Sequence, residues 1–157
     1  MAGHRFEIDN LCLSADGKYI ASASFTDIRL WDTETGMQIG KAMNVGNVQS
    51  LCFSPDGKYL VSSSGALDYQ EGSLCLWDVR QQQQLGNPLL IHNDESGQVT
   101  FNPEGDEIVY SSPSGGLIKI PFASFDKITA DFHKLLLKRE LSETERQDYF
   151  LGDILGD

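Results

Sequence analysis

The acidic side chains at two short turns are the first residues of this sequence that could do chemistry. Asp16 and Asp56 each precede a glycine, in the segments Ser-Ala-Asp-Gly and Ser-Pro-Asp-Gly. An acidic residue followed by a glycine that can take positive φ suits a short hairpin connection. We therefore expect both aspartates to shape turns rather than to act as catalytic carboxylates.

The cysteines and histidines give no stronger chemical signal. Cys12, Cys52 and Cys75 lie in apolar, strand-like runs and form no C-x-x-C pair, so they are expected to be small core residues. The histidines are His4, His92 and His133. The sequence has no Gly-x-Ser-x-Gly elbow, no phosphate-binding glycine loop and no His-Glu-x-x-His helix. We predict no catalytic residue, no cofactor and no metal site, although spacing alone neither builds nor excludes a Ser-His-Asp triad.

Net charge narrows the classes of partner. The chain has 23 acidic and 12 basic residues, a formal net charge of −11. Nucleic acid is an unfavourable partner because its affinity comes largely from lysine and arginine on phosphates, and anionic membranes are disfavoured for the same reason. No apolar run approaches the length of a membrane helix, and no signal peptide is visible at the amino terminus. We expect a soluble cytoplasmic protein.

An internal repeat organises the chain around these residues. The segment 11-LCLSADGKYIASAS-24 returns forty positions later as 51-LCFSPDGKYLVSSS-64, and 99-VTFNPEG-105 is a weaker third copy. Each copy continues into a short apolar run, at 28–32, 74–78 and 117–121, and the first two add a fourth run at 37–43 and 84–91. Four short strands repeating about every forty to fifty residues are typical of β-propeller blades.

These residues resemble the WD-repeat family. Trp31-Asp32 and Trp77-Asp78 end the third strand of their repeats, as the dipeptide that names the family does, Gly3-His4 precedes Asp16 at the family's usual spacing, and His92 holds the equivalent place in the third copy. The segments 31–43 and 77–89 are similar to blades of WD-repeat proteins fused to NACHT or kinase domains. The resemblance implies a non-enzymatic scaffold that binds a protein or peptide.

The repeats also depart from the family pattern. In its best-formed repeats, an Asp six residues before the Trp joins the His, a Ser or Thr and the Trp in a hydrogen-bonded tetrad. Phe25 and Glu71 occupy that place here, Asn44 replaces the second His, and Pro121 replaces the third Trp. The resemblance therefore implies that no repeat has a complete tetrad.

The expected fold is all-β, a partial β-propeller of about three blades with a helical tail. Blades are expected at about 3–44, 45–92 and 93–122, the first two four-stranded and the third three-stranded, within a repeat region 1–122 followed by an extension at 123–157. Apolar residues at helical spacing from Phe125 and a capping box at 142-SETE-145 predict two helices there.

Eleven strands do not close a propeller, because rings use about four to eight blades and fewer leave sheet edges unpaired. Either the chain is part of a longer propeller whose upstream blades are missing, which we favour, or another copy or another chain pairs with the open edges.

One loop is the candidate recognition site. The second repeat has six more residues between its Asp-Gly turn and its Trp than the first, around 64-SGALDYQEG-72. Variable loops on a rigid scaffold are where recognition tends to occur, so we expect partner contacts from Leu67, Asp68, Tyr69, Gln70 and Glu71. A neutral surface insertion is the alternative for this loop. Two alternatives stand for the whole chain: a propeller belonging to a larger peptidase or translocation protein, and a degenerate fragment without independent function.

Overall fold

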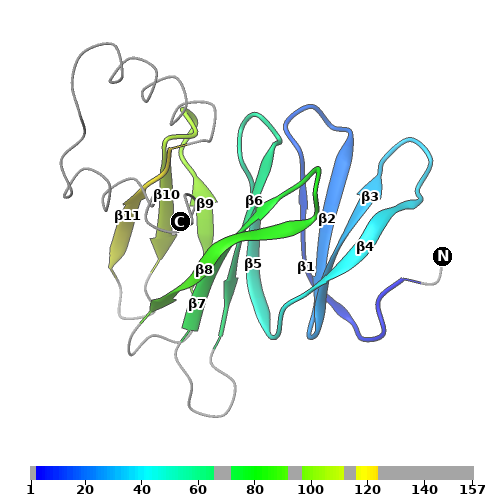
Figure 1. The fold of residues 1–157 in the computed structure, drawn as a ribbon, viewed down its shortest axis with the longest axis horizontal. Coiled ribbons are helices and arrows are strands. Elements are labelled where there is room, and N and C mark those ends of the chain that lie inside the picture. Colours follow the sequence, from blue (N-terminus) through cyan, green and yellow to red (C-terminus); the bar gives the residue numbers. More distant parts are fainter. Residues whose placement is uncertain (1–2, 66–71, 92–96, 112–115, 124–157) are drawn as a thin grey trace, which may run out of the picture. The chain divides into compact units, whose positions relative to one another are not determined.

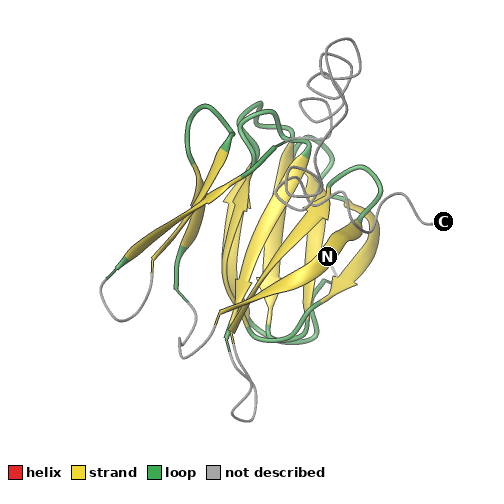
Figure 2. Cartoon of the chain, turned by 60° about the vertical axis from the view of Figure 1, so that its left-hand side comes forward, coloured by secondary structure: helices red, strands yellow, loops and turns green. Residues whose placement is uncertain are grey.

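A computed structural model describes residues 3–65, 72–91, 97–111 and 116–123. In these ranges the elements are strands joined by turns (Figure 2). The first sheet has the order β1-β2-β3-β4, with β1 at Ile8–Leu13, β2 at Tyr19–Ser24, β3 at Asp27–Asp32 and β4 at Gln38–Asn44. The second sheet has the order β5-β6-β7-β8, with β5 at Val48–Phe53, β6 at Tyr59–Ser64, β7 at Gly72–Asp78 and β8 at Gln83–Ile91. The third sheet pairs β9 at Val99–Phe101, β10 at Glu107–Ser111 and β11 at Leu117–Pro121.

The three sheets confirm the predicted all-β fold of two four-stranded blades and one three-stranded blade. Neighbouring strands pair antiparallel throughout the first two sheets and between β9 and β10. The strand orders make each sheet a meander in which sequence neighbours are also neighbours in space. The predicted boundary between the repeat region and the extension, at 122–123, falls at the last described residues. The two predicted tail helices lie outside the described residues. The chain divides into two compact units, Met1–Ile120 and Pro121–Asp157.

The repeated hairpins form because the same side chains bond the same backbone groups. In the first sheet the Asp16 carboxylate accepts from the Ser14 hydroxyl at 2.7 Å and from the backbone N–H of Lys18 at 3.1 Å. Gly17 follows with φ of 72°, a backbone conformation that a residue with a Cβ atom adopts only at a cost. Ser54 and Asp56 repeat this arrangement in the second sheet. Local sequence therefore determines where each first strand turns into the second.

Neighbouring sheets pack face to face (Figure 1). We call the face of each sheet that carries Leu11, Leu51 or Val99 its leading face, and the opposite face, which carries Cys12, Cys52 or Thr100, its trailing face. Alternation along a strand puts successive side chains on opposite faces. The leading face of the second sheet packs on the trailing face of the first, and that of the third on the trailing face of the second.

The main apolar core lies between the first two sheets. From the trailing face of the first sheet it takes Ala21, Ala23, Ile28, Leu30 and Met43, and from the second sheet Val48, Leu51, Phe53, Leu60, Cys75 and Trp77. Small alanines on β2 leave room for the bulky leucine, phenylalanine and tryptophan opposite them, as close packing requires. The core therefore consists of contacts between blades more than of contacts within one blade.

A different, partly polar contact joins the second and third sheets. The Ser50 hydroxyl accepts from the backbone N–H of Val99 at 3.1 Å, and the Ser63 hydroxyl donates to the Gly97 carbonyl at 2.7 Å. Val99, Phe101, Ile108 and Tyr110 are buried behind them. Among the described residues there is no helix long and apolar enough to cross a membrane.

Candidate functional site

In the first two sheets, the loops at one end of the strands are joined to each other by backbone hydrogen bonds. The β2–β3 turn, the β4–β5 connection and the residue that follows β6 form this edge, which we call the lower rim because it lies along the bottom of Figure 1. The Asn47 N–H donates to the Phe25 carbonyl at 2.8 Å, and the Gly65 N–H donates to the Asn47 carbonyl at 3.0 Å. Val45 adds a bond to the Thr26 carbonyl at 3.2 Å. These bonds fix the loop positions of one sheet relative to the next.

The predicted recognition loop starts from this rim. Leu67, Asp68, Tyr69, Gln70 and Glu71 lie outside the described residues, so their predicted role stays a prediction. The structure describes the two strand ends that carry the loop: Ser64 of β6 pairs with Ser73 of β7, and their hydroxyls are 2.7 Å apart. The base of the loop is therefore held by the sheet on both sides.

An exposed aromatic pair lies next to the first part of this rim. Phe6 and Phe25 meet edge to face, with ring centroids 6.3 Å apart and planes at 72°. About half of each side chain is exposed, 52% for Phe6 and 48% for Phe25. Sequence reasoning considered Phe25 only as a departure from the family motif and missed the pair. The available signal was a phenylalanine inside the turn Ser24-Phe-Thr-Asp27, where polar residues are usual.

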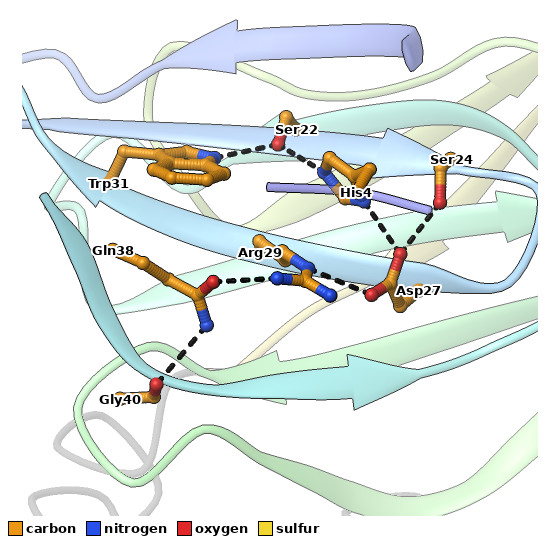
Figure 3. A network of polar contacts seen from close by, with 8 residues as sticks. All are labelled: His4, Ser22, Ser24, Asp27, Arg29, Trp31, Gln38 and Gly40. Carbon is orange, nitrogen blue, oxygen red and sulfur yellow. Dashed lines mark hydrogen bonds and ion pairs between the residues drawn. The ribbon is translucent and has the colours of Figure 1, made fainter. Parts of the chain in front are cut away.

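A buried polar network joins β2, β3 and the segment that precedes β1 in the first sheet (Figure 3). His4 lies between Asp27 and Ser22: its Nδ1 is 2.6 Å from Asp27 Oδ1 and its Nε2 is 2.6 Å from Ser22 Oγ. Trp31 Nε1 donates to the same hydroxyl at 2.7 Å. Ser24 and Arg29 donate to the Asp27 carboxylate at 2.6 and 2.8 Å, and the Arg29 guanidinium continues to Gln38.

This network corrects the expectation that no repeat has a complete tetrad. The family pattern expects the carboxylate six residues before Trp31, where this chain has Phe25. Asp27, four residues before Trp31, supplies it instead. The short β2–β3 turn brings Asp27, the first residue of β3, within reach of His4. In the second sheet only the Trp77 indole bond to Ser62, at 3.0 Å, is seen among the described residues, and Asn44 is exposed.

Each polar group of the network has a partner. Both ring nitrogens of His4 lie within hydrogen-bond distance of an oxygen, Nδ1 of Asp27 and Nε2 of Ser22, and the Ser22 oxygen also accepts from Trp31. Burial on its own raises the pKa of Asp27, but the hydrogen bonds from Ser24, His4 and Arg29 outweigh it, so the pKa lies below its usual value. Gly3 fits here because a Cβ atom would come within 2.9 Å of the Trp31 ring.

The remaining motif carboxylates that the structure describes also bond to the backbone. Asp32 accepts from the N–H and hydroxyl of Thr35 at 2.7 Å each, bonds that lower its pKa, and Asp78 accepts from the Gln81 N–H at 2.6 Å. The pKa of Asp16 is also lowered, mainly by the hydrogen bond from the Ser14 hydroxyl and then by that from the Lys18 N–H. Asp16, Asp32 and Asp78 therefore stabilise turns. His92, the remaining motif residue, lies outside the described residues.

The cysteines are placed as packing groups. Burial, with a contribution from nearby Cys52, raises the pKa of the Cys12 thiol to about 12, and burial also raises that of Cys75. A thiol that stays protonated near neutral pH is a poor nucleophile and a poor metal ligand. All three cysteines are free, and no cluster of three potential metal ligands occurs in the ranges that the structure covers.

Comparison with protein families gives one match. The model of the WD domain, G-beta repeat, matches residues 1–32 and 41–78. Each matched segment ends on one of the two Trp-Asp pairs. No curated protein has a sequence that matches this chain.

Comparison with solved structures supports the fold. A chain of the hydrazine synthase of Kuenenia stuttgartiensis matches with a TM-score of 0.62 and 16% identity, over 77% of this chain and 36% of that one. This chain therefore spans little more than a third of that relative. In all, 637 chains of solved structures match, and a fold shared so widely does not by itself identify a function.

Proposed function

Because the chain belongs to the WD-repeat family, with family repeats in residues 1–32 and 41–78, we propose that it is a non-enzymatic module that binds a protein or peptide through the lower rim. The observation that carries the proposal is the exposed Phe6–Phe25 pair beside a rim whose connections are hydrogen-bonded from sheet to sheet. Aromatic side chains presented by a rigid frame make strong interface anchors. The loop 66–71 starts from the same rim and would extend the contact.

Charge supports a basic or neutral partner. The net charge of −11 repels acidic proteins and favours encounter with basic ones. Phe6 and Phe25 would contribute the apolar part of the contact, and the acidic surface would orient the partner. We therefore propose a peptide or protein segment that combines an apolar anchor with lysine or arginine.

The absence of catalysis is part of the proposal. Its support is positive: His4, Asp16, Asp27, Asp32 and Asp78 each make hydrogen bonds that hold a turn or a strand pair. Only 1% of the His4 side chain and 3% of Ser22 are exposed, so the Ser22–His4–Asp27 network offers no surface that a substrate could reach. A cytoplasmic location is proposed with it, since free cysteines fit a reducing compartment.

A displayed random-peptide library tests the proposal. Peptides selected on the immobilised full chain would be measured by fluorescence polarisation against wild type, F25A, F6A, Y69A and a control, M37A. Met37 is a suitable control because it is an exposed apolar residue, at 70%, in the β3–β4 turn on the opposite edge of the sheet. We expect a preference for basic and apolar peptides and at least about a tenfold loss of affinity in F25A, the size expected of an interface anchor.

Two results would contradict the proposal. One is a selection that returns no peptide above background. The other is a set of peptides whose affinity falls in M37A and not in F25A, F6A or Y69A. That result would place the binding surface at the opposite ends of the strands, where the β3–β4 turn lies. Loss in Y69A alone would keep a lower-rim site but assign it to the loop.

A further inference from the structure

The leading face of the first sheet is exposed at positions that the other two sheets bury. Leu11 is 67% exposed, whereas Leu51 and Val99, its equivalents in β5 and β9, are 6% and 5% exposed. Leu13 is 58% exposed, against 6% for Phe53 and 7% for Phe101. One chain thus contains the same surface once uncovered and twice covered.

Other positions of this face follow the same rule. Ile8 of β1 is 53% exposed and its equivalent Val48 is 3% exposed. Trp31 is half-buried where Trp77 is buried. Several large apolar side chains exposed together on one sheet face, here Ile8, Leu11 and Leu13, are typical of an interface. In both covered cases the covering surface is the trailing face of a neighbouring sheet.

The third sheet carries a trailing face of the kind that this surface would accept. Its β10 residues Val109 and Ser111 are half-exposed and repeat Val61 and Ser63 of β6, which belong to the trailing face that covers β9. Leu117 and Ile118 of β11 are adjacent and exposed, at 74% and 44%. Since adjacent strand residues point to opposite faces, one of these two lies on the trailing face.

We propose that the leading face of the first sheet binds the trailing face of the third sheet in a second copy of this chain. The contact repeats the packing that the chain already uses twice internally, so it needs no new kind of surface. Two copies related by a twofold axis make two such contacts, and their six sheets fall within the four to eight blades of closed rings. This proposal does not depend on the lower rim or its partner.

Light scattering on the full chain, over a concentration series, tests the proposal directly. We expect a mass of about twice the 17.4 kDa of one chain. Because each copy carries −11, added salt should raise the dimer fraction by screening repulsion. L11E should give the mass of one chain with an unchanged circular dichroism spectrum, since Leu11 is exposed within one copy. M37E, equally exposed but on a turn, is the matched control and should stay dimeric.

A mixing experiment identifies the two faces. V109E places its charge on the trailing face of the third sheet and should also be monomeric. A mixture of L11E with V109E restores one intact contact, so it should associate although neither variant does alone.

Three results would overturn the proposal. They are a wild-type protein that is monomeric at all concentrations, a dimer that L11E leaves intact, and a mixture of L11E and V109E that does not associate. A monomeric wild type would assign the exposed face to a sheet of another protein or of a longer chain.

Discussion

At the scale of single residues, Asp27 has the role that depends most on its surroundings. It is 5% exposed and accepts from Ser24, His4 and Arg29. A buried carboxylate with three donors is stable as an anion, because hydrogen bonds to the charged form offset its loss of water. The same carboxylate ties the segment preceding β1 to β2 and β3, so one side chain joins three segments of the chain.

D27N should destabilise the chain by about 1–3 kcal/mol, because it weakens charge-assisted hydrogen bonds and leaves Arg29 without its ion pair. The pKa of Asp27 is lower in the folded state than in the unfolded one. Its contribution is therefore present in full above the unfolded pKa of about 3.9 and is lost as pH falls through the folded value. Urea unfolding at pH 7 and at pH 3 measures this difference.

The matched control for D27N is E34Q, since Glu34 is an exposed acid in the β3–β4 turn. It should leave the urea midpoint unchanged at both pH values. A D27N midpoint equal to wild type at pH 7 would show that the network contributes no net stability.

At the scale of elements, Gln82 clips the second sheet to the first. It lies in the turn before β8, and its side chain accepts from the Lys41 N–H at 2.9 Å and donates to the Ile39 carbonyl at 2.6 Å, both on β4. The clip requires Gly40, because a Cβ atom there would occupy the position of the Gln82 amide. Gly86 of β8 has a similar φ, 65° against 62°, with no atom within 4 Å of an added Cβ.

G40A and G86A should therefore differ in cost. Both force a residue with a Cβ into positive φ, which costs about 1–2 kcal/mol. G40A also displaces Gln82 and its two hydrogen bonds, adding about 1–2 kcal/mol. Chemical denaturation of the two variants measures the difference, and it should disappear in the Q82A background. Equal costs in the wild-type background would mean that Gln82 adds nothing to the packing of the two sheets.

At the scale of the whole molecule, stability depends on which sheet faces are covered. Leu11 and Leu51 are the same residue at the same place in two repeats, yet 67% and 6% exposed. The hydrophobic effect scales with the area removed from water, so identical local sequences contribute unequally. The contribution of a repeat's apolar face to the free energy of unfolding therefore depends on whether a neighbouring sheet covers that face.

L51A should cost about 2–5 kcal/mol, as truncation of a buried leucine does. L11A, at protein concentrations low enough to keep single copies, should change stability by less than about 0.5 kcal/mol. Thermal unfolding at several concentrations measures both. A growing cost of L11A with concentration would be expected of the proposed dimer, and equal costs at the lowest concentration would contradict the packing described.

The sequence by itself determined the elements and their order. Apolar runs with strand-forming residues placed β3, β4, β7, β8 and β11 close to their observed bounds, and the Asp-Gly turns placed the hairpins between first and second strands. These features follow from short-range chemistry: side chains within two to five residues bond the turn, and alternation selects the buried face. The repeat then implied the meander of each sheet.

Only the tertiary structure decided how the repeats differ. The Asp27 carboxylate completes the His4 network from a position the family spacing does not predict, because the fold places the first residue of β3 beside the histidine. Gln82 finds Gly40 across the boundary between two sheets, and Phe6 meets Phe25 across nineteen residues of sequence. Exposure of Leu11 and burial of Leu51 follow from neighbours far along the chain, which no local pattern contains.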